Sequence, residues 1–157
     1  MGFLSWLEST AYSDWILTSY TGWPLMLSAH AVGLAIIVGI SFALSLRMLG
    51  LYTGIPLATM CRFIPIAWIG FAINLITGLS LFMTQATTYV TSAPFIIKIS
   101  FIVLGCVNLH YTRKIIIREA AGWEELSTPE PLAVGLAVGS VAYWTVAVVT
   151  GRMIAYL

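Results

Sequence analysis

Charged side chains are scarce in this sequence. Only 8% of the 157 residues are Asp, Glu, Lys or Arg, whereas 60% are apolar, and the mean hydropathy is +0.97. Soluble domains carry about 25% charged residues, so this composition excludes an ordinary water-soluble protein. The net charge of +1 also removes any electrostatic case for binding nucleic acid. We therefore expect the lipid bilayer to be the solvent and the main partner of the chain.

Cysteines and N-terminal basic residues are also few. Cys61 and Cys106 are far apart and form no CxxC or CxxCH motif, so neither a zinc site nor covalently attached haem is indicated. Residues 1–23 contain no Lys or Arg. Because a cleavable signal peptide begins with basic residues, we do not expect one here.

Long apolar segments occupy most of the chain. Residues 3–18 place apolar side chains on one helical stripe and predict a single short interfacial helix, and residues 85–93 are expected to form a loop. A helix needs about 20 mostly apolar residues to cross the hydrocarbon layer. Four segments meet this requirement, residues 24–49, 60–83, 94–118 and 131–156. The sequence therefore predicts an all-α fold, an integral membrane four-helix bundle in one domain of residues 1–157.

The basic residues predict how this bundle is oriented. Five of the seven Lys and Arg residues lie at the ends of the first-to-second and third-to-fourth connections, namely Arg47, Arg62, Arg113, Lys114 and Arg118. The positive-inside rule places these connections in the cytoplasm. We therefore expect a multi-pass protein of the bacterial inner membrane with both termini outside.

Three ionisable side chains lie within the predicted spans near their other ends. With a rise of about 1.5 Å per residue, His30, Lys98 and Arg152 are roughly 6–9 Å from the outer ends of their helices. Ionisable groups are costly at such depths and are usually functional. His110 is on the order of 15 Å from His30 along the membrane normal, so these two histidines are not expected to bind one haem iron.

A haem would balance the charge of this layer, because the predicted spans contain no Asp or Glu. In this hypothesis His30 is the axial ligand of haem b, and Arg152 binds a propionate. Lys98 is a second propionate partner or, if deprotonated, the opposite axial ligand. Gly33 would let the flat macrocycle approach the first helix, and Asn74 would face inward from the second.

Simpler interpretations of these residues stay open. His30 could be hydrogen-bonded to a Ser or to a backbone carbonyl of a neighbouring helix. Lys98 and Arg152 could extend to the outer headgroups. Arg152 could also pair with Glu8 or Asp14 of the interfacial helix.

Two other functions compete with haem-dependent electron transfer or anchoring of a redox complex. Met26 and His30 are four residues apart on one helix face, and a thioether with an imidazole suits Cu(I), so copper handling is one alternative. The other is a cofactor-free accessory subunit that packs against further membrane subunits. Trp23 and Tyr89 are expected to belong to the interfacial aromatic belt.

Motifs along nearly the whole chain resemble an uncharacterised family of small bacterial four-helix membrane proteins. The matching stretches are residues 30–35, 46–51, 67–71, 77–79, 94–98, 108–110 and 151–156. The terminal stretch, Gly-Arg-Met-Ile-Ala-Tyr, is the most specific of them.

More remotely, the chain is similar to the superfamily of the copper-resistance D membrane domain and the haem-binding bacterial protoporphyrinogen oxidases. In those oxidases a helix-one histidine binds haem and a helix-three lysine is required, and His30 and Lys98 fall on these positions. The resemblance therefore implies haem binding at His30. It does not extend to the charged helix-one start or the Asn-Glu-Pro motif of the oxidases, which this sequence lacks.

Overall fold

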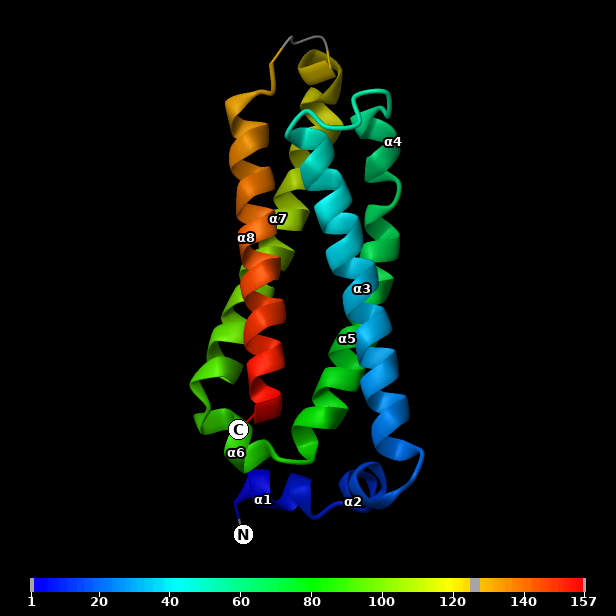
Figure 1. Ribbon diagram of the computed structural model, residues 1–157, viewed down its shortest axis with the longest axis vertical. Coiled ribbons are helices and arrows are strands. Elements are labelled where there is room, and N and C mark those ends of the chain that lie inside the picture. The colour runs from blue at the N-terminus through cyan, green and yellow to red at the C-terminus, as the bar shows by residue number, and fades with distance from the viewer. Residues whose placement is uncertain (1, 125–127, 157) are drawn as a thin grey trace.

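The computed structural model describes residues 2–124 and 128–156, in which helices joined by short connections are the only regular structure and no strand is present (Figure 1). The helices are α1 (Phe3–Glu8), α2 (Ala11–Thr18), α3 (Gly22–Met48), α4 (Leu57–Cys61), α5 (Ile64–Met83), α6 (Ala86–Thr91), α7 (Ala93–Glu124) and α8 (Pro131–Met153), followed by a 3-10 turn, η1 (Ile154–Tyr156). Four segments are long and apolar enough to cross a membrane, with α4 and α5 together forming the second. The predicted all-α fold is therefore confirmed, and the chain is a multi-pass membrane protein.

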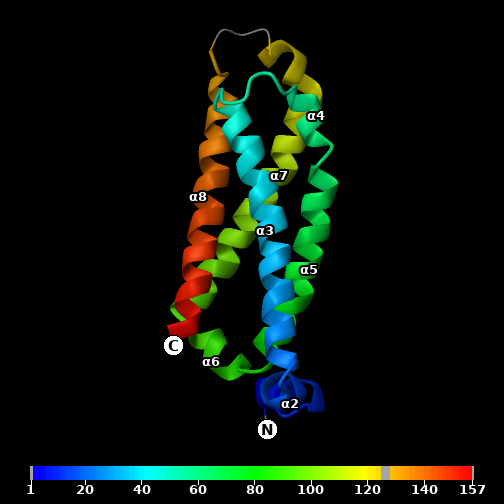
Figure 2. The ribbon, with the colours of Figure 1, turned by 45° about the vertical axis from the view of Figure 1, so that its right-hand side comes forward.

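The long helices form two antiparallel pairs. α3 packs against α5, α7 packs against α8, and further contacts of α3 with α8 and of α4 with α7 join the pairs. The short helices α1, α2 and α6 lie across the end of the bundle that holds both chain termini (Figures 1 and 2). We call this the terminal end, and we call the opposite end, with the α3–α4 and α7–α8 connections, the loop end.

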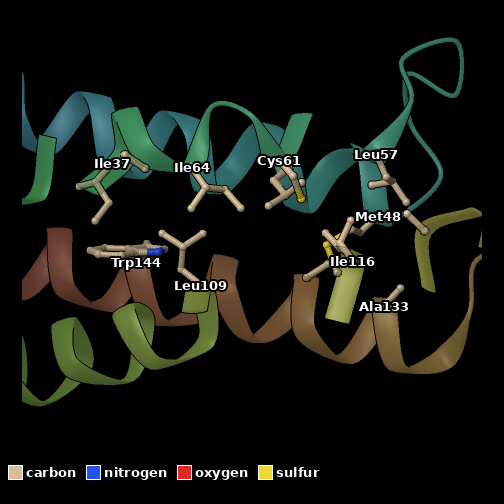
Figure 3. Packing of buried hydrophobic residues seen from close by; sticks show 13 residues of the cluster. Ile37, Met48, Leu57, Cys61, Ile64, Leu109, Ile116, Ala133 and Trp144 are labelled. Carbon is tan, nitrogen blue, oxygen red and sulfur yellow. The ribbon is translucent and has the colours of Figure 1, made fainter. Parts of the chain in front are cut away.

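Apolar side chains join the two pairs in the middle of the bundle and toward the loop end. Figure 3 shows Ile37 and Ile64 on one side facing Trp144 and Leu109 on the other. Trp144 is only 1% exposed, and its ring fits against Gly105, where a Cβ would come within 2.9 Å of it. Helices in lipid associate through such close packing rather than through the hydrophobic effect. Toward the terminal end, in contrast, the ribbons of the two pairs lie farther apart (Figure 1).

The predicted single helix over residues 3–18 is wrong, because the structure has two helices there. Thr10 separates them, and its Oγ1 accepts a hydrogen bond from the backbone N–H of Ser13 at 3.2 Å. This local bond caps α2 and competes with a continuous helix. As a result α2 buries Ser13 and Ile16, whereas Trp15 is exposed.

The second span is interrupted rather than continuous. α4 ends at Cys61 and α5 begins at Ile64. Pro65 explains the break, because its ring crowds the carbonyl group four residues earlier and it has no backbone N–H to donate. The expected loop over residues 85–93 was also wrong, since it contains α6.

Close contact between α3 and α5 depends on two glycines. Gly33 and Gly70 are both buried where the helices meet, and a Cβ on Gly33 would lie 2.7 Å from the Gly70 carbonyl oxygen and 2.8 Å from the Asn74 nitrogen. The Asn74 side-chain amide also donates to the carbonyl oxygen of His30 at 2.8 Å. Gly33 and Asn74, predicted as cofactor-binding residues, therefore hold two helices together.

We predict that Gly33→Ala destabilises the protein by about 1–3 kcal/mol, because the new methyl group meets backbone atoms that cannot rotate away. Gly39→Ala on the same helix is the matched control, since nothing lies within 4 Å of the position of its Cβ. The control should be neutral or slightly stabilising, because Ala favours a helix over Gly. Reversible unfolding in mixed detergent micelles measures both changes, and equal effects of the two substitutions would contradict this packing.

Candidate functional site

A cavity of about 160 Å³ lies at the terminal end of the bundle and is open on one side. Its walls come from both helix pairs, with α6 and η1 completing them. Most of the lining is apolar, but His30 and Lys98 both reach it. The lining residues are Trp23, Leu27, His30, Gly78, Leu81, Phe82, Tyr89, Phe95, Lys98, Gly151, Ile154 and Ala155.

α5 holds His30 at two points. The Asn74 amide binds the His30 carbonyl, as described above, and the imidazole Nδ1 lies 3.1 Å from Thr77 Oγ1. The ring also lies against Gly78, where a Cβ would be 3.1 Å from His30 Cε1. Both the backbone and the ring of this residue are therefore fixed by the neighbouring helix. The simpler interpretation expected a Ser or a backbone carbonyl as the partner of the ring, and the structure places the hydroxyl of Thr77 there.

The Thr77 hydroxyl determines which imidazole nitrogen carries the proton. Its single proton goes to the Ile73 carbonyl oxygen, which is 2.7 Å away and four residues earlier. Thr77 Oγ1 must therefore accept from His30, so we assign the proton of the neutral ring to Nδ1. Nε2 of this neutral ring then has a free lone pair, and the hydrogen bonds of the described residues include none to it. Metal-binding histidines are oriented by the same type of bond at their other nitrogen.

Lys98 reaches the cavity from the opposite helix pair. Its side chain crosses Gly151 of α8, where a Cβ would lie 3.3 Å from Lys98 Cδ and Cε and 3.4 Å from Nζ. Within the described parts of the chain, no carboxylate lines the cavity and no residue hydrogen-bonds to Lys98. The cavity therefore contains an acceptor, His30 Nε2, and an amino donor, Lys98, neither of which is hydrogen-bonded by another residue of the described parts of the chain.

Three aromatic rings form one wall. Phe95 is nearly parallel to Phe82, with ring centroids 5.3 Å apart, and to Tyr89, with centroids 5.9 Å apart. Burial raises the pKa of Tyr89, so its hydroxyl stays protonated at neutral pH. Trp23 and Tyr89, expected only in the interfacial belt, both line the cavity.

A carboxylate fastens the N-terminal helices to this wall. Glu8 Oε1 accepts from the backbone N–H of Thr87 at 2.8 Å and from its hydroxyl at 2.7 Å. The backbone bond, followed by the side-chain bond, holds the pKa of Glu8 below its usual range. Because α6 carries both Thr87 and Tyr89, this contact positions part of the cavity wall. Sequence reasoning missed it, since no local motif links residues 79 positions apart.

Arg152 does not join His30 and Lys98. It is exposed and absent from the cavity lining, and its guanidinium lies over the Tyr156 ring at 5.6 Å from the centroid. Glu8, its possible partner, is bonded to Thr87 instead. Depth along the helix axis predicted one site for all three groups, but only His30 and Lys98 line the same cavity.

Haem fits this cavity only in part. The free Nε2 of His30 is suited to an axial ligand, and Lys98 could meet a propionate. However, pockets for drug-sized ligands occupy about 300–1,000 Å³, and the 160 Å³ present here is roughly half of the lower value. A macrocycle does not fit between the helix pairs in this arrangement.

Met26, the other residue predicted to bind a metal, does not belong to the cavity lining. Its sulfur is 3.9 Å from the Tyr12 hydroxyl. Residues 2–124 and 128–156 contain no group of three or more His, Cys, Asp or Glu that could hold a metal ion. His110 is exposed on α7 beside the Tyr111 ring.

A larger cavity of about 440 Å³ lies at the loop end, but its main charged groups already have partners. Arg47, only 8% exposed, donates through Nε to the Ile55 carbonyl at 2.6 Å and through Nη2 to that of Thr53 at 3.4 Å. Glu130 accepts from the backbone N–H of Ala133 and caps α8. These contacts serve the ends of helices, so the terminal-end cavity is the better candidate for a functional site.

Comparisons with protein-family models, with curated proteins and with solved structures found no match.

We predict that Glu8→Gln weakens the attachment of α6 at neutral pH, because a neutral amide oxygen is a poorer acceptor than a carboxylate. In the unsubstituted protein the same weakening should appear as the pH falls through the lowered pKa of Glu8, below its ordinary value of 4.5. Hydrogen–deuterium exchange of the Thr87 amide, corrected for intrinsic rates, measures both effects. Glu119→Gln on the exposed face of α7 is the control, and equal protection of Thr87 in the two variants would contradict the attachment.

Proposed function

We propose that this protein binds a small lipophilic ligand in the cavity between His30 and Lys98. The observation that carries the proposal is an apolar cavity with an imidazole acceptor and an amino donor, neither of which is satisfied by the described residues. Polar groups at membrane depth are costly without partners. A ligand that forms hydrogen bonds with both groups would remove that cost. Its binding would also explain why two polar side chains lie in an otherwise apolar cavity.

The size of the cavity supports a ligand much smaller than a tetrapyrrole. An apolar cavity of about 150 Å³ is large enough to hold one benzene molecule, and the cavity here is about 160 Å³. Because it is open on one side, only part of a longer molecule needs to fit inside. The proposed ligand is therefore one with a compact polar head and an apolar remainder.

The basic residues support a location for this site. Arg47, Arg62 and the basic residues of α7 from Arg113 to Arg118 belong to the loop end, and by the positive-inside rule we place that end in the cytoplasm. In this orientation both termini lie outside, and the cavity opens within the outer leaflet of a bacterial inner membrane. A ligand would then reach the cavity from the lipid or from the outer surface.

Haem b, acting in electron transfer or in a redox anchor, is the second candidate. It is favoured by one observation, the Thr77 bond that leaves His30 Nε2 free. It would require the two helix pairs to separate further at the terminal end. Copper handling and a cofactor-free accessory role have no comparable support from the contacts of the site.

The test is to purify the full-length protein in a mild detergent and to identify bound molecules by native mass spectrometry and absorption spectroscopy. We expect a small bound molecule in the unsubstituted protein, with occupancy lowered roughly tenfold in His30→Ala and Lys98→Met, because each loses a hydrogen bond made in an apolar site. Ser28→Ala, on the exposed side of α3, is the control and should retain the molecule.

Equal occupancy in all four proteins would contradict the proposal. A Soret band in the unsubstituted protein that disappears in His30→Ala would contradict binding of a small lipophilic ligand and support haem binding instead. Partner subunits that co-purify irrespective of His30 and Lys98, with no small molecule bound, would favour the accessory role.

A further inference from the structure

The hydrogen-bonding groups of the cavity identify a class of ligand, an inference that rests on the binding role proposed above. We propose that the cavity holds the head group of a lipid-soluble hydroquinone, a single aromatic ring that carries two hydroxyl groups and an alkyl tail. Shape and hydrogen bonding lead to this class independently.

The shape of the site favours one flat ring. The volume of about 160 Å³ matches a single six-membered ring with small substituents. The rings of Phe82, Tyr89 and Phe95 lie within 34° of one another and provide a wall against which an aromatic ring can stack. The open side of the cavity would let an alkyl tail extend outward while the ring stays inside.

The polar groups require a ligand that both donates and accepts. In the neutral ring Nδ1–H is bonded to Thr77, so His30 Nε2 is an acceptor and needs an O–H or N–H donor. Lys98 is a donor and needs an oxygen. These two groups come from opposite helix pairs, so a ring with hydroxyl groups on opposite edges can meet both.

Other lipophilic or anionic ligands satisfy the site less well. A carboxylate or phosphate would suit Lys98, but it would turn its own lone pairs toward that of His30 Nε2. A quinone, the oxidised form of the same ring, accepts from Lys98 and has no proton for His30. The site should therefore prefer the reduced form, which would give the protein a role in handling an electron carrier of the membrane.

The test compares three versions of one molecule on the delipidated, full-length protein under anaerobic conditions. The probes are decyl-hydroquinone, the corresponding decyl-quinone, and the hydroquinone dimethyl ether, which keeps the ring but has no hydroxyl proton. Isothermal titration in one detergent gives the three dissociation constants. We expect the hydroquinone to bind roughly 2–10-fold more tightly than either of the others, the range for one neutral hydrogen bond.

The variants separate the two polar contacts. His30→Ala should remove the preference for hydroquinone over quinone and leave quinone binding nearly unchanged. Lys98→Met should weaken both by about 10-fold or more, because a charged donor is lost, and Ser28→Ala should change neither. Partitioning of each probe into the detergent is the same for all four proteins. The dissociation constants of one probe can therefore be compared directly between the proteins.

Two results would overturn the inference, and only the second of them also contradicts the proposed binding role. If the three probes bind equally or not at all while another bound molecule still depends on His30 and Lys98, the hydroquinone assignment is wrong and the binding role stands. If no molecule of any kind depends on these two residues, the proposed binding role is wrong as well.

Discussion

The hydrogen bond between His30 and Thr77 is the constraint on which the site depends. Thr77 gives its own proton to the helix backbone and accepts the proton of His30 Nδ1. In the neutral ring this chain of two bonds leaves the opposite nitrogen, Nε2, unprotonated, and the hydrogen bonds of the described residues include none to it. In an apolar cavity such a group has a strong preference for a donor, so a common structural bond between two helices also creates the chemistry of the site.

The fold makes room for this chemistry by distributing its packing unevenly. Close contacts concentrate in the middle of the bundle and toward the loop end, where Trp144 fills the space between the helix pairs. At the terminal end, α3 and α5 stay together through Gly33 and Gly70, while α7 and α8 lie farther away (Figure 1). The short helices α1, α2 and α6 cross this end, and Glu8 ties two of them together. The cavity thus forms because the helix pairs are packed together toward the loop end, whereas at the terminal end they lie farther apart and the short helices cross the opening.

Much of this architecture could be predicted from the sequence, because the bilayer imposes strong rules. Length and apolar character located the four spans, and depth along the helix axis placed His30 and Lys98 at the same level. Depth does not fix the direction of a side chain around the helix axis, however. Arg152 was therefore assigned to the site, although its side chain lies over Tyr156 instead.

Some of the features that were not predicted depend on contacts between distant segments. The roles of Gly78 and Gly151 follow from the side chains that cross them, those of His30 and Lys98, and neither contact has a local signal. The interruption before Pro65 and the cap at Thr10 do have local signals, and the rules for proline and for capping residues could have located both. The volume of the cavity, which decides against a bound macrocycle in this arrangement, follows only from the complete packing.

The protonation state of His30 tests the account most directly. The chain has two histidines, so ¹⁵N-histidine NMR of the detergent-solubilised protein, with His110→Ala to assign the signals, can distinguish the two nitrogens of each ring. At neutral pH in ligand-free protein, we expect His30 to be protonated at Nδ1 and bare at Nε2, and we expect Thr77→Val to remove this preference. A His30 ring protonated at Nε2, or at both nitrogens, would contradict the account.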